Sequence, residues 1–321
     1  MKKLFCLTAI TTLLITVVML CSGCGKPSNA TTSENISLTF PMTVTDDLGN
    51  KIVLPAQPQK IISLALATDE ILSVVADKSA LYGLSILSDD KYYSNIIDFA
   101  ATVPHKFAGK DLEKLIQAKP DLVITASWVD ARDLARLKAA GIPTYAAKLP
   151  DTIDDIRTLI KNIGIITGNS DHATATIAIM DQQLHAVTEA TGQIPPDQRL
   201  NALMTDNLFY VYGDNALSAQ LLKIANINNL AAKIGVTKID NVSKERIVAA
   251  DPQAIFISAY SAEDNNNPAA VYLNDKSFAN VRAVKNHKIF VINNPHLTAM
   301  SQFIALGAAD VARAAYPNVQ F

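Results

Sequence analysis

One segment of this chain occurs twice, and this repetition constrains the fold more than any other feature of the sequence. Residues 113–125 read EKLIQAKPDLVIT and residues 245–257 read ERIVAADPQAIFI, so both glutamates and both prolines recur at an offset of 132 residues (245 − 113 and 252 − 120). Each copy predicts a short helix that the proline ends, followed by a buried apolar strand, because proline lacks the N–H that a helix interior requires. We therefore expect two similar α/β lobes rather than one continuous domain.

An aromatic residue follows each predicted strand at the same step, Trp128 in the first copy and Tyr260 in the second. Ligands of open α/β sheets bind beyond the carboxyl ends of the strands. The two aromatic side chains should therefore flank one cleft between the lobes, which is the arrangement of a two-lobed binding protein.

The rest of the pattern divides the chain further. Residues 41–150 alternate short strands and helices after a hairpin with a Gly-Asn turn, and residues 193–321 repeat the alternation. Residues 151–192 are helical in pattern, and the stretch 171–191 contains neither glycine nor proline, which favours a stiff helix of about 30 Å between the lobes. The expected fold class is α/β, with two Rossmann-like lobes of mainly parallel sheet joined by one long helix.

Composition excludes several classes of partner. The chain of 321 residues has 49% hydrophobic and 18% charged residues, which is enough apolar material for two folded lobes. Its formal net charge is −2, and the body of the chain contains no basic block. Nucleic acid and anionic membrane surfaces are therefore not expected as partners.

The amino terminus predicts where the protein acts. The chain begins MKK, and residues 4–20 form an uncharged, largely apolar run before the sequence CSGC. This pattern is typical of a secretory signal. The ending resembles a bacterial lipobox, in which the cysteine, here Cys24, is lipidated and residues 1–23 are removed, although Cys21 stands where a lipobox usually has an aliphatic residue. The alternative is an uncleaved membrane anchor, since the apolar run is near the lower length limit of a spanning helix.

Processing at Cys24 would leave residues 24–40 as a flexible linker, rich in Lys, Pro, Ser, Asn and Thr, before the folded body. The protein would then be extracytoplasmic and held by its lipid at the outer face of the cell membrane or in the periplasm. All three cysteines, Cys6, Cys21 and Cys24, lie in the first 24 residues. The body therefore contains no thiol, which excludes thiol catalysis, cysteine-ligated zinc and iron–sulfur clusters there.

Four motifs together resemble one protein family. They are VTDDLG at 44–49, LEKLIQAKPDLV at 112–123, VSKE at 242–245 and KNHKIFV at 285–291, and they occur in order across roughly residues 40–321. The family is the substrate-binding proteins of ABC importers for cobalamin, ferric siderophores and haem. The resemblance implies a monomer without a cofactor of its own, whose two lobes hold a small metal chelate with little hinge motion and deliver it to a permease dimer.

The resemblance also assigns two docking residues. Glu113 and Glu245 stand where the family places the acidic residues that meet arginines of the permease. Each opens a helix that runs antiparallel to the following strand, so its amino end should lie at the carboxyl edge of the sheet. The alternative is that a glutamate in the first helical turn only favours the helix dipole, by about 0.3–1 kcal/mol.

Aromatic side chains are expected to line the cleft, because they supply large apolar contact with a flat macrocycle or a catecholate. Phe107 lies six residues before Glu113, where relatives with a cobalamin site can place a ligand-contacting tryptophan. Arg132, just beyond Trp128, could pair with an anionic chelate. The predicted ligand-binding residues are Phe107, Trp128, Tyr260, His296, Tyr92, Tyr93, Tyr212 and Arg132, with Tyr210 as an alternative to Tyr212. Core packing or plain surface exposure is the alternative for each aromatic residue.

His296 follows the last predicted strand and could ligate the iron of haem or the cobalt of a corrinoid. Met300, four residues on, could be a soft ligand, and a hydrogen-bonding role is the alternative for the histidine. The other histidines show no paired metal spacing, so we expect no protein-held metal site.

Three other functions compete with a chelate receptor. A receptor for a free metal or an oxyanion could share the fold, and so could a non-transport surface lipoprotein. An enzyme would be a third class, but the sequence contains no P-loop, no Gly-x-Ser-x-Gly elbow and no cysteine ligand set. The sequence does not choose between an iron chelate, either a ferric siderophore or haem, and cobalamin.

Overall fold

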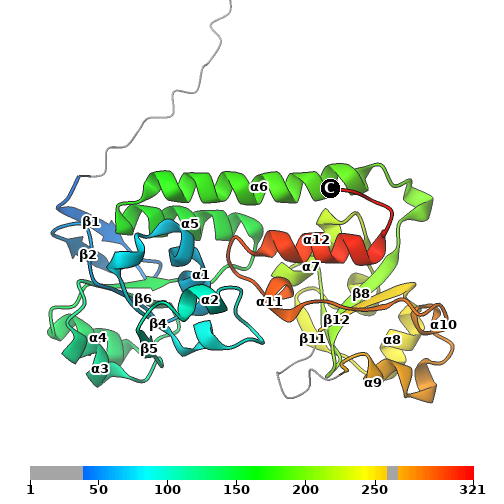
Figure 1. Cartoon of the computed structure of the whole chain (residues 1–321). Helices are drawn as coiled ribbons and strands as arrows, with labels where there is room; N and C mark the ends of the chain where they lie inside the picture. The colour runs from blue at the N-terminus through cyan, green and yellow to red at the C-terminus, as the bar shows by residue number, and fades with distance from the viewer. Residues whose placement is uncertain (1–38, 259–266) are drawn as a thin grey trace, which may run out of the picture. The chain divides into compact units, whose positions relative to one another are not determined.

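A computed structural model describes residues 39–258 and 267–321 (Figure 1). The predicted signal peptide, the lipidation residue Cys24 and nearly all of the linker lie outside the described residues, as does Tyr260. In the described part, no helix has the length and apolar character needed to cross a bilayer.

The body begins with the predicted hairpin. Strands β1 (Met42–Thr45) and β2 (Lys51–Leu54) pair antiparallel, and Gly49 in the turn between them has a φ of +85°, a conformation that favours glycine. Asp46 holds this turn, because its carboxylate accepts hydrogen bonds from the backbone N–H groups of Leu48 and Asn50. The hairpin that the sequence predicts is therefore confirmed.

The amino-terminal lobe contains one sheet whose neighbouring strands all pair in parallel. The strand order is β5-β4-β3-β6-β7. The strands are β3 (Ile61–Ser63), β4 (Leu81–Ser85), β5 (His105–Phe107), β6 (Leu122–Ala126) and β7 (Thr144–Ala147). In chain order this is 3-2-1-4-5, the order of a doubly wound Rossmann-type half, so the order reverses between β3 and β6.

The carboxyl-terminal lobe contains a mixed sheet with the order β11-β9-β8-β12-β13, and β10 pairs with β8 as well. β12 is parallel to both β8 and β13, whereas β9 is antiparallel to β8 and to β11. Only three residues, 207–209, join β8 to β9, and so short a connection can make a hairpin but not a parallel crossover. The strands are β8 (Asn201–Asp206), β9 (Tyr210–Tyr212), β10 (Asn228–Asn229), β11 (Ile239–Asn241), β12 (Ala254–Ser258) and β13 (Ile289–Val291).

The sequence repeat is a structural repeat. Helix α3 (Leu112–Ala118) and strand β6 in the first lobe correspond to helix α8 (Lys244–Ala250) and strand β12 in the second, with all bounds shifted by 132 residues. Each helix also ends in a left-handed residue at the same step, Lys119 with a φ of 48° and Asp251 with a φ of 47°. The prediction of two similar α/β lobes is confirmed.

Two long helices connect the lobes. Helix α5 (Ile153–Thr167) begins at a capping box formed by Thr152 and Asp155, and Gly168, with a φ of +75°, separates it from α6 (Ser170–Gly192). Helix α6 is about 34 Å long at 1.5 Å per residue. It packs against α5, α1, α7 and α12, and therefore runs past elements of both lobes (Figure 1).

One face of α6 is buried along the length of the helix. Its buried residues recur at spacings of three and four, which is one stripe of a helix. They are Ala173, Thr176, Met180, Leu184, Val187 and Thr191. Four of them, the alanine, methionine, leucine and valine, belong to a single apolar cluster that also contains Ile71 of the first lobe and Leu221 of the second. The hydrophobic core is therefore continuous from one lobe to the other.

The remaining helices are shorter. They are α1 (Leu66–Val75), α2 (Ile97–Ala100), α4 (Ala131–Ala139), α7 (Leu217–Ile224), α9 (Ala270–Leu273), α10 (Arg282–Lys285), α11 (Asn294–Leu297) and α12 (Ile304–Ala315). Short 3-10 helices lie at η1 (Lys78–Ala80), η2 (Ile86–Asp89), η3 (Pro196–Gln198), η4 (Ala231–Ile234) and η6 (Lys276–Phe278).

Candidate functional site

The order of the strands indicates at which edge of each sheet a binding site is expected. Binding sites of doubly wound sheets lie beyond the carboxyl ends of the strands where the strand order reverses. In the first lobe this point is between β3 and β6, so the start of α1 and the turn that carries Trp128 flank it. In the second lobe the parallel neighbours β8 and β12 end at the equivalent place. We call these places the carboxyl edges of the two sheets.

Large apolar side chains are exposed at both carboxyl edges. Ile86 and Leu87 follow β4, Trp128 follows β6, and Leu208 and Tyr210 follow β8; all five are among the exposed large hydrophobic residues. Exposed apolar groups that gather at one edge mark binding surfaces more often than scattered ones do. Both lobes therefore expose apolar side chains at their carboxyl edges.

Trp128 is the most exposed of these residues, at 72% of its possible area. It lies in the turn between β6 and α4, and Asp130 caps α4 by accepting a hydrogen bond from the Arg132 N–H at 2.8 Å. The Arg132 guanidinium also binds Asp130, at 2.7 Å, and this contact lowers the pKa of Asp130 to about 2. Arg132 therefore reaches back to its own helix cap.

The predicted aromatic residues differ in how far their side chains are exposed. Tyr92 is buried and Tyr93 is half-buried, and their rings meet edge to face with centroids 4.7 Å apart. Tyr212 is half-buried, with its hydroxyl 3.4 Å from Asp206. Phe107 and Tyr92 both differ from the expectation, since they are only 5% and 6% exposed, and Phe107 packs in an apolar cluster with Ile62 and Leu115.

The burial of Phe107 has a simple cause. It is the last residue of β5, and its ring lies over Gly83 of the neighbouring strand, where a Cβ atom would come within 2.3 Å of the ring. The missing side chain of Gly83 makes the space that the ring fills. Phe107 therefore presents almost no surface to a ligand.

His296 lies on α11, and its Nδ1 is 2.6 Å from an Asp310 carboxylate oxygen on α12. A carboxylate at one ring nitrogen orients the imidazole and leaves the other nitrogen for a further partner. Met300, four residues on, is partly exposed. Within the described residues, no group of three or more His, Cys, Asp or Glu side chains is placed to hold a metal ion. Ligation by His296 stays a prediction.

The sequence analysis missed two buried carboxyl groups on α1. Asp69 and Glu70 are 0% and 1% exposed, although the helix LATDEILSVV is otherwise almost entirely apolar. Burial raises the pKa of both carboxyl groups, for Asp69 to about 7. Two adjacent acids inside an apolar helix next to a β-strand were the signal that could have revealed them, because such groups are seldom buried without a specific partner.

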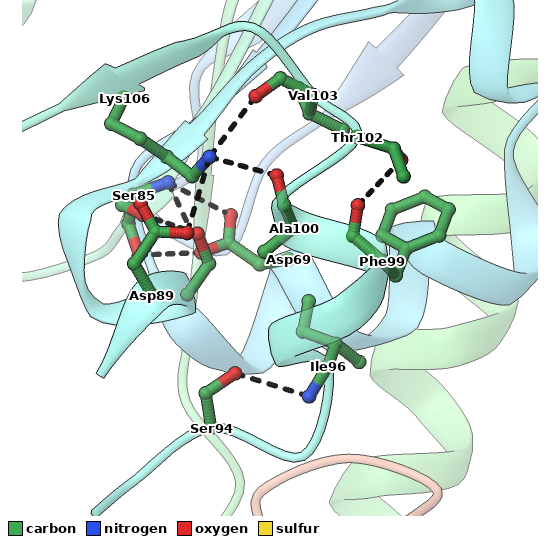
Figure 2. Close-up of polar contacts among 11 residues, drawn as sticks. Asp69, Ser85, Asp89, Ser94, Ile96, Phe99, Ala100, Thr102, Val103 and Lys106 are labelled. Carbon is green, nitrogen blue, oxygen red and sulfur yellow. Dashed lines mark hydrogen bonds and ion pairs between the residues drawn. The ribbon is translucent and has the colours of Figure 1, made fainter. Parts of the chain in front are cut away.

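Asp69 fixes the end of strand β4. Its carboxylate accepts hydrogen bonds from the Ser85 N–H at 3.1 Å and the Ser85 hydroxyl at 2.5 Å. Figure 2 shows this pair beside Lys106, whose ammonium group donates to the carbonyls of Ala100 at 2.9 Å and Val103 at 3.0 Å. Lys106 is also 3.3 Å from Asp89. Both ends of the segment 86–103, which carries Tyr92 and Tyr93, are therefore held by charged side chains.

Glu70 contacts both lobes. Its carboxylate accepts hydrogen bonds from the Asn95 N–H of the first lobe, at 3.0 Å, and from the Ser301 hydroxyl of the second, at 2.5 Å. Beside these contacts lies a cavity of about 380 Å³ whose lining includes Asn95 and Phe303.

A third buried carboxyl group stands at the carboxyl end of β8. Asp206 accepts hydrogen bonds from the backbone N–H groups of Leu208 at 2.8 Å and Tyr210 at 3.0 Å. Burial raises the pKa of Asp206, and these hydrogen bonds oppose the rise. The aspartate therefore shapes the tight β8–β9 turn that exposes Leu208.

The predicted docking glutamates occupy equivalent positions but have different partners. Each is the second residue of its helix, Glu113 of α3 and Glu245 of α8, and both are exposed. Glu113 forms an ion pair with Arg136 of α4. Among the described residues Glu245 forms no ion pair, and hydrogen bonds, first from its own N–H and then from Ser243, lower its pKa. Asp111 precedes α3, and its carboxylate accepts a hydrogen bond from the Ala108 N–H rather than from the first turn of the helix.

The buried Asp69 carboxyl predicts a pH dependence of stability. A carboxyl whose pKa is raised in the folded state stabilises the fold at low pH, and this contribution is lost as the pH rises from 3.8 through about 7. Asp69→Asn has no proton to lose, so its free energy of unfolding should improve relative to the wild type over this range, on the order of 1–4 kcal/mol. Urea unfolding of both proteins at about pH 4 and about pH 8 measures the change. An equal difference at the two pH values would contradict the prediction.

Comparison with known proteins agrees with this geometry. Residues 61–295 match the periplasmic binding protein family. The chain is 24% identical to an uncharacterized ABC transporter substrate-binding lipoprotein, YvrC of Bacillus subtilis, over 95% of this chain and 96% of the relative. It is 23% identical to a cobalamin-binding protein of Halobacterium salinarum, over 86% of this chain and 74% of the relative.

Solved structures share the fold. The molybdate-bound molybdate-binding protein MolA of Haemophilus influenzae superposes with a TM-score of 0.70 at 19% identity, covering 86% of this chain and 91% of that chain. The apo form of the haem-binding protein RhuT of Roseiflexus superposes with a TM-score of 0.68 at 18% identity, covering 82% and 99%. Since the family match spans most of the chain, the protein belongs to the periplasmic binding protein family and is a solute-binding component of an ABC transporter.

Proposed function

We propose that the solute is a metal chelate with a broad apolar face, either an iron chelate (haem or a ferric siderophore) or cobalamin, bound between the carboxyl edges of the two sheets. The observation that carries the proposal is the group of exposed apolar side chains at these edges, with Trp128 the most exposed. A flat macrocycle gains large contact area from such side chains. The protein then passes its ligand to the permease without chemistry.

Most arginines of this chain form ion pairs with its own carboxylates, which supports a ligand that needs few cationic partners. Six of the seven arginines lie within 4 Å of a carboxylate of this chain, and Arg132, nearest to Trp128, is held by Asp130. Anionic ligands are usually bound by free guanidinium groups, which match carboxylate or catecholate geometry. This favours haem or a corrinoid, which is largely apolar across its face, over a highly charged siderophore.

A free metal or an oxyanion is the alternative, because a relative with the same fold is named as a molybdate-binding protein. A small oxyanion would need convergent hydrogen-bond donors rather than a large apolar surface. Molybdate therefore belongs in the same titration as the chelates.

We further propose that the mature protein is a monomer anchored by a lipid on Cys24, and that Glu113 and Glu245 meet cationic residues of the permease. The similarity to a protein named as a lipoprotein supports the anchor. The equivalent, exposed positions of the two glutamates on α3 and α8 support a partner that contacts both lobes at once.

Titration with tryptophan fluorescence tests the ligand class, because Trp128 is the only tryptophan in the chain. We expect saturable quenching of the chain from residue 25 onward by haemin, cyanocobalamin or a ferric catecholate, but not by molybdate. Trp128→Phe should weaken binding roughly threefold to tenfold, because a smaller ring loses contact area. Calorimetry of the variant is the control, since these ligands absorb light. Binding of molybdate alone would overturn the proposal in favour of the oxyanion alternative.

Charge reversal tests docking. Glu113→Lys combined with Glu245→Lys should reduce uptake in cells at least tenfold while leaving ligand affinity unchanged, because like charges would face each other across the interface. Glu189→Lys on α6 is the matched control, an exposed glutamate away from α3 and α8. Normal uptake in the double variant, or a loss of ligand affinity, would count against a docking role.

Substitution of the cysteine tests the anchor. Cys24→Ala should leave the chain unprocessed and without lipid, which mass spectrometry and membrane fractionation detect. Cys21→Ala should still be processed, because only the lipidated cysteine carries the chemistry. If Cys24→Ala has the same mass change and the same membrane association as the wild type, the anchor lies elsewhere.

A further inference from the structure

The carboxylate of Glu70 accepts three hydrogen bonds, from two residues far apart in the sequence. Oε1 accepts from the Asn95 N–H at 3.0 Å and from the Asn95 side-chain amide at 2.9 Å, and Oε2 accepts from the Ser301 hydroxyl at 2.5 Å. Ser301 is itself fully buried. A buried carboxylate is tolerated only when such partners replace water.

Three further hydrogen bonds cross between the lobes around this carboxylate. The Asn95 amide also donates to the Pro295 carbonyl at 2.9 Å, and the Gln302 amide donates to the Glu70 carbonyl at 2.8 Å. The buried Asn294 amide donates to the Tyr92 carbonyl at 2.9 Å. We call Glu70, Asn95, Asn294, Ser301 and Gln302 the interlobe lock.

We propose that Glu70 is a positioning residue: by joining Ser301 of the second lobe to Asn95 of the first, it fixes the segment that carries Tyr92 and Tyr93 beside the carboxyl edge of the first sheet. The consequence for ligand binding rests on the proposed function, whereas the lock itself does not. Glu70 touches no ligand in this role and acts through the segment 86–103.

The segment 86–103 is also held at its two ends, and these contacts differ from the interlobe lock. Asp69 holds Ser85 just before it, and Lys106 holds the carbonyls of Ala100 and Val103 at its far end (Figure 2). These two attachments lie entirely within the first lobe. The lock is the attachment that ties the middle of the segment, next to the tyrosines, to the second lobe.

The lock depends on hydrogen-bond geometry more than on charge. A glutamine at position 70 could accept from Asn95 through its oxygen and donate to Ser301 through its nitrogen, because a hydroxyl can donate or accept. An alanine there would lose both contacts and leave the Asn95 and Ser301 groups buried without their partner. Glu70→Gln and Glu70→Ala therefore separate the two explanations.

Hydrogen exchange of the full chain, without ligand, tests the lock directly, since the Asn95 N–H donates to Glu70 itself. We expect Ser301→Ala and Glu70→Ala to accelerate exchange at least tenfold in residues 92–97, and Glu70→Gln to exchange within about threefold of the wild type. Thr191→Val removes another fully buried hydroxyl, on α6, and is the control for a general loss of stability.

The outcomes divide clearly. Acceleration confined to residues 92–97 and the lock, with Glu70→Gln close to the wild type, supports the proposal. Acceleration of equal size in β12 for Ser301→Ala means that the variant loosens the whole fold, and this overturns the positioning role, as does unchanged exchange at Asn95. The exchange experiment is done without ligand, so its result does not depend on the ligand titration. The proposed ligand and the positioning role of Glu70 can therefore fail independently of each other.

Discussion

Two neighbouring carboxyl groups, Asp69 and Glu70, are buried in the middle of an apolar helix, and the contacts that they require organise the structure around α1. Removing an ionised carboxylate from water costs several kcal/mol, so each group requires hydrogen-bond donors in fixed places. For Asp69 these are the N–H and hydroxyl of Ser85, and for Glu70 they are Asn95 and Ser301. The hydrogen bonds of Asp69 thus hold the chain at the end of β4, and those of Glu70 link the first lobe to Ser301 of the second.

A second constraint complements the first. The apolar stripe of α6 joins a core that runs through both lobes, and burial of this kind is strong but not directional. Hydrogen bonds of the interlobe lock are weaker in sum but directional. The helix therefore holds the lobes together, while the lock determines how the segment 86–103 lies against the second lobe.

The side chains that the sequence analysis chose for the site differ in exposure and in their partners. Trp128 was chosen because it follows a predicted strand, and it is exposed at the carboxyl edge. Phe107 was chosen from the family resemblance, and its ring fills the space above Gly83. Arg132 was chosen for its charge, yet Asp130, two residues before it, binds that charge. The burial of Phe107 depends on Gly83, a neighbour only in space, whereas the partner of Arg132 is close in sequence and could have been found there.

The sequence by itself determined the two-lobed α/β fold, the equivalence of α3–β6 with α8–β12, and the long helix between the lobes, because each follows from local periodicity and a repeat at fixed spacing. The tertiary structure alone decided that Glu70 meets Ser301, 231 residues away, and that the second sheet has antiparallel strands at one edge. Contacts at such separation depend on how the lobes pack, and packing is set by the volume and direction of many side chains together. The local periodicity of a sequence therefore cannot predict how the two lobes pack together.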